Sequence, residues 1–135
     1  MIDHFSLSVK DFNSSLEFYD KTLETLGYSR VMTLDMPENG LKCAGYGKDG
    51  KPSFWIGDMG RDDETIGQAK WVHVAFQAPD DAAIRAWYKK CLELGGTDNG
   101  APGPRLEYHP GYYGAFVVDP SGWRIEAAFH GYQPK

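Results

Sequence analysis

The sequence predicts an α+β fold built from two βαβββ modules, and three observations support this prediction. First, the chain matches itself without a gap when it is shifted by 69 positions, with seven identical residues among the 24 from position 4 to position 27. Second, each copy opens with a β-rich segment that leads into an amphipathic helix ended by glycine. Third, short β-rich segments separated by turn sequences follow each helix. A repeat of this length indicates a duplicated structural unit.

The chain of 135 residues is expected to form a single domain, 1–135, that is long enough to bury a substantial core. Module one is expected at about residues 1–60 and module two at about residues 70–131. Each module alone would lie near the lower size limit of a stable domain. The repeat therefore predicts two modules of one domain rather than two independent domains.

In module one, residues 2–9 are expected to form a strand, followed by apolar residues at alternating spacings of four and three. This spacing gives a helix one apolar face. Asp11 or Asn13 is the expected N-cap, and Gly27 is expected to end the helix. Three further strands, separated by turn-forming sequences, are expected at residues 28–34, 41–47 and 53–57.

Module two repeats this order, with a strand expected at residues 70–78. Asp80 or Asp81 is the expected cap of its helix, which closes at Gly95 and Gly96. A connecting stretch rich in glycine and proline then leads to a short segment around Leu106. The remaining strands are expected at residues 112–118 and 123–129.

Composition excludes several classes of partner. The formal net charge is -5 and the basic residues are scattered, whereas binding to a nucleic-acid backbone needs a clustered excess of Lys and Arg. No apolar run approaches the roughly 18 residues that a membrane span requires, and the first residues do not have the pattern of a secretory leader. Cys43 and Cys91 show neither metal-ligand nor disulfide spacing, and Cys91 is expected to be a buried free thiol. We therefore expect a soluble cytoplasmic protein without nucleic-acid or membrane partners.

Three residues are candidate metal ligands. His4 and His73 occupy equivalent positions near the start of each copy, where an apolar residue is the ordinary choice. Glu126 interrupts an otherwise apolar final strand, where a carboxylate is costly unless it is paired or coordinated. A structural role would explain either histidine alone, but their repetition favours a shared metal site. Two imidazoles and one carboxylate suit zinc, nickel, manganese or ferrous iron and leave positions open for substrate or water.

The sequence resembles the vicinal oxygen chelate family, which includes glyoxalase I, extradiol dioxygenases and the bleomycin and fosfomycin resistance proteins. The resemblance covers the whole chain and is carried by residues 2–11, 14–19, 73–76 and 115–126. Its most specific parts are the Phe18-Tyr19 pair, the two histidines in order, and the ending that runs from Asp119-Pro120 to Ile125-Glu126. Residues 100–105 and 108–113 are similar to a subgroup of small bacterial proteins described only as glyoxalase-like.

The resemblance implies that the paired modules form a curved, cup-like mixed sheet around a metal, with ligands on the first and last strands. It also implies a small substrate that chelates the ion through two neighbouring oxygens, so that the metal acts as a Lewis acid. A homodimer is expected as well, because modules of this family often complete their cups with those of a partner chain.

One departure from the family pattern separates the subclasses. Glyoxalase I carries a second carboxylate in the last strand of its first module, but here the counterpart of Glu126 is Trp55 or Gly57, depending on register. Neither residue can bind a metal or accept a proton, so glyoxalase I activity is disfavoured. The remaining ligand set resembles the facial triad of extradiol dioxygenases, and a metal-dependent lyase or dioxygenase is expected instead.

Several residues are expected around this site in addition to the ligands. His109 and Tyr113, which lie just before the strand that carries Glu126, are candidates for acid/base roles beside Glu126 itself. The expected substrate-binding residues are Trp55, Arg105, Tyr108 and Tyr112. Core filling is the expected role of Phe54 and Phe116, and His130 is expected at the surface.

The sequence also leaves open a function of another class. A protein of the bleomycin-resistance type sequesters a planar or aromatic compound in the same cleft without a metal. Such a protein would be expected to lack the ligands, whereas His4, His73 and Glu126 are all present.

Overall fold

A computed structural model of the chain describes residues 1–58 and 64–135, and it contains two mixed sheets of four strands each. In module one, β1 pairs in parallel with β4, and β4, β3 and β2 pair antiparallel, which gives the order β1-β4-β3-β2. Its elements are β1 (Phe5–Ser8), α1 (Phe12–Glu24), β2 (Ser29–Met36), the 3-10 helix η1 (Pro37–Asn39), β3 (Leu41–Lys48) and β4 (Lys51–Asp58).

Module two has the same topology, with the strand order β5-β8-β7-β6 and a parallel β5–β8 pair. Its elements are β5 (His73–Gln77), α2 (Asp81–Glu93), β6 (Thr97–Pro104), β7 (Tyr113–Val118) and β8 (Arg124–Phe129). The predicted α+β fold with two βαβββ units is thereby confirmed. No helix in the described ranges is long and apolar enough to cross a membrane.

The helix starts resolve the alternatives that the sequence left open. The Asp11 side chain accepts a hydrogen bond from the Ser14 backbone N–H at 3.0 Å, and the Asp80 side chain accepts one from the Ala83 N–H at 2.7 Å. Each carboxylate satisfies a backbone donor that the first helical turn leaves free. Asp11 and Asp80 are therefore the N-caps, at equivalent positions of the repeat.

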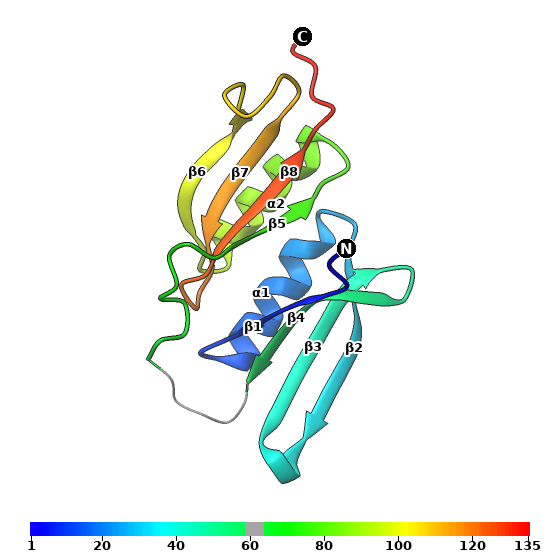
Figure 1. Cartoon of the computed structure of the whole chain (residues 1–135), viewed down its shortest axis with the longest axis vertical. Coiled ribbons are helices and arrows are strands. Elements are labelled where there is room, and N and C mark those ends of the chain that lie inside the picture. Colours follow the sequence, from blue (N-terminus) through cyan, green and yellow to red (C-terminus); the bar gives the residue numbers. More distant parts are fainter. Residues whose placement is uncertain (59–63) are drawn as a thin grey trace.

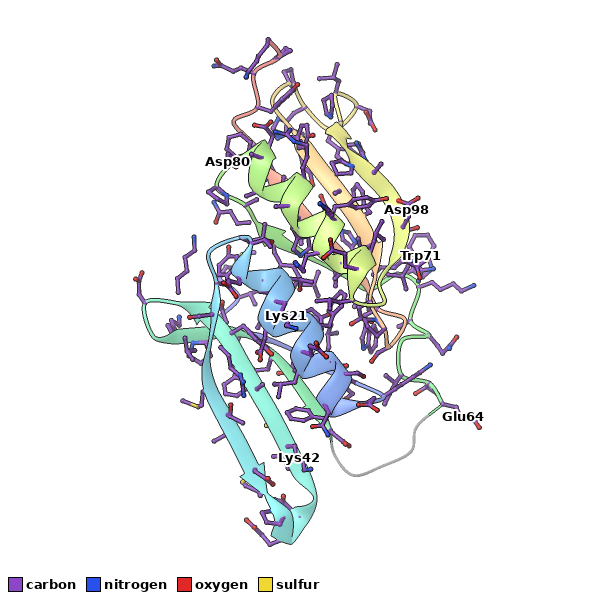
Figure 2. All side chains as sticks on the ribbon, turned by 180° about the vertical axis from the view of Figure 1, so that it is seen from behind. Lys21, Lys42, Glu64, Trp71, Asp80 and Asp98 are labelled. Atoms are coloured by element: carbon purple, nitrogen blue, oxygen red, sulfur yellow. The ribbon has the colours of Figure 1, made fainter. Side chains whose placement is uncertain are left out.

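The two sheets lie on the same side of the two helices. In Figure 1 both sheets are in front of α1 and α2, and Figure 2 shows the helices in front when the molecule is seen from behind. A hydrogen bond joins the modules, because Trp123 Nε1, just before β8, donates to the Ser8 carbonyl of β1 at 2.7 Å. Each sheet thus has one face packed against a helix and one face, called the open face below, turned away from it.

The helix-side faces share one apolar core. Trp87 and Tyr19 are fully buried, and Phe54 of β4 meets Phe76 of β5 with 5.0 Å between ring centroids. This contact continues the core from one module into the other. Phe54 and Cys91 are buried, as the sequence predicted.

One strand was not expected from the sequence. Residues 97–104 form β6, although the glycine- and proline-rich stretch 100–104 was expected to be a connection, and Leu106 lies in a turn with an exposed side chain. β6 is the edge of its sheet, so its prolines need not donate hydrogen bonds to a second neighbour. Its register with β7 shifts twice, at Asp98/Gly100 and at Gly100/Gly103.

Candidate metal centre

Glu126 is the most unusual residue on the open face of module two. It lies in the middle of β8, between Ala75 of β5 and Phe116 of β7, and its side chain is almost completely buried. Its Oε1 atom lies 3.4 Å from Nε2 of His73, and its Oε2 atom accepts a hydrogen bond from the Tyr112 hydroxyl. A buried carboxylate with one hydroxyl donor and one imidazole beside it is suited to receive a cation.

The separation between His73 Nε2 and Glu126 Oε1 fits two ligands of one metal ion. Ligand atoms about 2.0–2.2 Å from a tetrahedral ion lie about 3.3–3.6 Å apart, and the observed separation is 3.4 Å. The His73 side chain is 56% exposed, which leaves the position between the two atoms accessible. The separation of the two atoms is therefore compatible with two ligands of one divalent ion.

His4 precedes β1, and its Nδ1 donates to Oδ1 of Asp3 at 2.7 Å. This bond lowers the pKa of Asp3, to which Lys51 contributes as well. In its neutral form, His4 with the proton on Nδ1 keeps the Nε2 lone pair for a metal, as does a histidine paired with a carboxylate in metal sites. The tautomer thus suits the ligand role expected from the sequence.

The structure brings two of the three expected ligands together. His73 faces Glu126, whereas His4 pairs with Asp3 on the open face of module one. Within residues 1–58 and 64–135, no group of three or more His, Cys, Asp or Glu side chains is arranged to hold a metal. The three-ligand site itself remains a proposal.

Trp55 is the structural counterpart of Glu126. Ser6 of β1 pairs with Trp55, and the equivalent residue of β5, Ala75, pairs with Glu126. The register therefore selects Trp55 over Gly57, and the open face of module one carries an indole where module two carries a carboxylate. Trp55 and His4 line a cavity of about 550 Å³ on this face, together with Leu34, Leu41 and Cys43.

Tyr112 contacts more groups at the site than the sequence indicated. It was expected among the substrate-binding residues, but its hydroxyl bonds to Glu126 and its ring packs edge-on against Tyr108, at 4.9 Å between centroids. Burial and the nearby Glu126 carboxylate raise the pKa of Tyr112. The sequence offered no pattern that would identify this bond, because the two residues are 14 positions apart on different segments.

His109 and His130 form a pair beside Tyr112. His109 Nε2 lies 2.9 Å from Nδ1 of His130, and His109 Nδ1 lies 2.7 Å from the Pro110 carbonyl, which can only accept. His109 therefore donates from Nδ1 and accepts the His130 proton at Nε2 when both rings are neutral. His130 is exposed, as expected, but its pairing with His109 was not foreseen.

Tyr113 does not reach Glu126. Strand alternation turns it to the helix side of β7, where it is buried and its hydroxyl accepts a hydrogen bond from Arg85 of α2 at 3.3 Å. An acid/base role for Tyr113 at Glu126 is incompatible with this position, which corrects the expectation from the sequence. His109 also makes no bond to Glu126 and contacts the site through the Tyr112 ring.

Arg105 is bound to the backbone of β6. Its guanidinium donates to the carbonyls of Ala101 at 2.7 Å and Gly103 at 2.9 Å, and it lies 5.3 Å from the centre of the Phe116 ring. Phe116, for which core filling was expected, is half-buried on the open face. Arg105 thus holds the irregular edge strand, and a contact of Arg105 or Tyr108 with substrate remains a prediction.

The chain is thus an α+β protein of two βαβββ modules, and its candidate ligands lie on the open faces of the sheets, away from the helices. A family model described as the Glyoxalase/Bleomycin resistance protein/Dioxygenase superfamily matches residues 1–127. The chain belongs to this superfamily, in agreement with the resemblance seen in its sequence. A comparison with curated proteins finds no match.

Solved structures share the fold. A glyoxalase/bleomycin resistance protein from Albidiferax ferrireducens T118 is 24% identical with a TM-score of 0.70, over 93% of this chain and 95% of that chain. Glyoxalase I from Zea mays is 26% identical with a TM-score of 0.70, over 93% of this chain and 44% of that chain, so this chain spans less than half of it. Leishmania major glyoxalase I is 21% identical with a TM-score of 0.60, over 94% of this chain and 84% of that chain.

Proposed function

We propose that this protein is a divalent-metal-dependent enzyme that acts on a small substrate chelating the metal through two adjacent oxygens. The observation that carries this proposal is the approach of His73 Nε2 to the buried Glu126 Oε1, at 3.4 Å. A buried carboxylate is costly unless it is paired or coordinated, so an ion between His73 and Glu126 would offset that cost. Membership in the superfamily supports the same reading.

Each candidate residue would have a distinct role in this function. His73, Glu126 and His4 would hold the ion, which as a Lewis acid stabilises negative charge on substrate oxygens. The cavity beside Trp55 would receive the apolar part of the substrate and exclude water from it. Trp55 stands where module two carries Glu126, so the open face of module one offers no carboxylate base at this position. A lyase or dioxygenase reaction is therefore favoured over the glyoxalase I isomerisation.

Metal content tests the proposal directly. Protein purified without a tag should carry close to one zinc, nickel, manganese or iron ion per chain, or take one up when the ion is added, as measured by elemental analysis after dialysis. His73→Ala should lose this ion because it removes one of the two facing ligands. His130→Ala is the matched control, since His130 pairs with His109 instead. Wild-type protein that binds none of the four metals would refute the metal site.

The third ligand is proposed to be His4, from the same chain or from a second copy in a homodimer. Its free Nε2 supports the ligand role, and its side chain is 55% exposed, so a partner could reach it. Family members often dimerise, which makes a shared site worth testing separately from the metal itself.

Mixing two variants that each lack one proposed ligand distinguishes a site shared between two chains from a site within one chain. In a dimer with shared sites, a His4→Ala chain paired with a His73→Ala chain keeps one intact site out of two. In a dimer with sites inside each chain, no mixed pair has an intact site. We expect the mixture, after unfolding and refolding together, to regain about a quarter of the wild-type metal content if sites are shared, since half of the dimers are mixed. Recovery close to zero would assign each site to one chain.

A metal-independent binding protein is the second candidate. It is favoured by the cavity of about 550 Å³ and by the absence, among the residues that the structure describes, of a complete three-ligand group. Binding of aromatic compounds that is unaffected by a chelator and by Glu126→Gln would support it. Loss of binding in either experiment would support the metal-dependent enzyme.

We also propose a reducing compartment, the cytoplasm, for this protein. Cys43 and Cys91 are both free thiols. Proteins of oxidising compartments more often pair their cysteines in disulfides.

A further inference from the structure

Tyr112 is held in place from several directions. Its ring lies edge-on to His109 and His130, with 5.4 Å and 4.9 Å between centroids, and edge-on to Tyr108. The His109–His130 bond joins the loop that carries Tyr112 to the chain just after β8. The ring is therefore fixed by groups from two segments, and its hydroxyl meets Glu126.

Two glycines make room for this arrangement. A Cβ at Gly114 would lie 3.1 Å from the Tyr112 ring and 3.3 Å from Glu126 Oε2, so a side chain there would press on both partners. Gly111 has a φ of +98°, and a Cβ there would lie 2.7 Å from the His130 carbonyl. A residue with a side chain at position 111 would strain the turn that leads into Tyr112.

The two oxygens of Glu126 thus have different partners. Oε2 accepts from Tyr112, whereas Oε1 faces His73 at the candidate metal position. A carboxylate can bind a metal through one oxygen or through both, and the second mode uses one more coordination position. The hydrogen bond from Tyr112 uses one of the two lone pairs of Oε2 and holds the carboxylate in one orientation, and so competes with the second mode.

We propose, on the basis of the function proposed above, that Tyr112 is a positioning residue that keeps Glu126 a one-oxygen ligand and so preserves an open coordination position for substrate. This role differs from substrate contact, which the sequence had suggested for Tyr112. It also differs from merely donating a hydrogen bond to a buried carboxylate, because it predicts that loss of the Tyr112 hydroxyl changes the number of protein ligands on the ion. Tyr112→Phe keeps the ring and its packing but frees Oε2.

Manganese provides the measurement, because Mn²⁺ prefers six ligands and its bound water is read from the relaxation rate of water protons. With one-oxygen binding by Glu126, an ion held by two or three protein ligands keeps four or three waters. Binding through both oxygens in Tyr112→Phe removes one water and lowers the relaxation enhancement per bound ion by roughly a quarter to a third. Tyr108→Phe is the matched control, since Tyr108 packs on the Tyr112 ring, whereas the hydroxyl that bonds to Glu126 belongs to Tyr112.

The possible results separate this inference from the function on which it rests. A loss of enhancement in Tyr112→Phe, with wild-type values in Tyr108→Phe, supports the inference. Wild-type enhancement in Tyr112→Phe refutes it and leaves the metal site standing. If another of the four metals binds but Mn²⁺ does not, crystal structures of the loaded wild type and Tyr112→Phe decide through the two Glu126 oxygen–metal distances. Wild-type protein that binds none of the four refutes both the inference and the proposed function.

Discussion

Replacing Asp119 with Ala should lower the free energy of unfolding by about 3–5 kcal/mol, because several buried donors would lose their acceptor. Asp119 is almost fully buried in the turn between β7 and β8. Its Oδ2 accepts from the Tyr19 hydroxyl of α1 at 2.5 Å, and its Oδ1 accepts from the Ser121 and Trp123 backbone N–H groups at 2.9 Å and 2.8 Å. Chemical denaturation monitored by circular dichroism measures the loss.

Two milder substitutions show which bonds matter. Tyr19→Phe removes one bond and leaves the backbone donors satisfied, so a loss of about 1–2 kcal/mol is expected. Asp119→Asn can still accept the two backbone bonds through Oδ1 and should lie between Tyr19→Phe and Asp119→Ala. Equal stability of Asp119→Ala and wild-type protein would show that this network does not hold the fold.

The same turn positions the candidate metal centre. Asp119 links module two to α1 of module one, and Ser121 of the turn accepts a bond from the Lys10 backbone N–H at 3.0 Å. β8 begins five residues after Asp119 and carries Glu126. Burial raises the pKa of Asp119, more than its hydrogen bonds lower it. Burial of the Asp119 carboxyl group is costly in desolvation, yet this group connects the two modules. It does so directly before β8, the strand that carries the candidate ligand Glu126.

The repeat and the helix periodicity were sufficient to predict most of the fold. Helical spacing and the aspartate caps are local properties, and the strands of module one were bounded by recognisable turns. β6 was missed because glycine and proline disfavour an isolated strand, whereas here β7 pairs with it and Arg105 binds its carbonyls. That support comes from residues outside the stretch itself, so local sequence could not reveal it.

The sequence could propose the candidate ligands but not the contacts around them. An acidic residue in an apolar strand identifies Glu126 from sequence, and the repeat identifies both histidines. The face that each residue occupies depends on register, which the β5–β8 and β1–β4 pairings supply. Tyr112 and Tyr113 are neighbours in sequence with similar chemistry, yet alternation sends only Tyr112 toward Glu126.

Glu126→Gln should remove most of the stabilisation of the protein by its metal without weakening the metal-free fold. At a free metal concentration of 100 times the dissociation constant, binding stabilises the wild type by about 2.7 kcal/mol. If loss of the charged ligand weakens binding about 100-fold, about 0.4 kcal/mol remains at the same concentration. Thermal unfolding with and without metal measures both values.

Without metal, Glu126→Gln should be at least as stable as the wild type. Glu126 is buried, and glutamine keeps its shape and can accept the Tyr112 hydrogen bond without carrying an ionisable group into the sheet. We therefore expect metal-free Glu126→Gln to unfold at the wild-type temperature or above it. Glu107→Gln is the control, since Glu107 is exposed and should leave the metal effect unchanged. If metal-free Glu126→Gln is stable but is no longer stabilised by metal, Glu126 serves metal binding at a cost in stability. If metal stabilises Glu126→Gln as much as it stabilises the wild type, Glu126 is not a ligand.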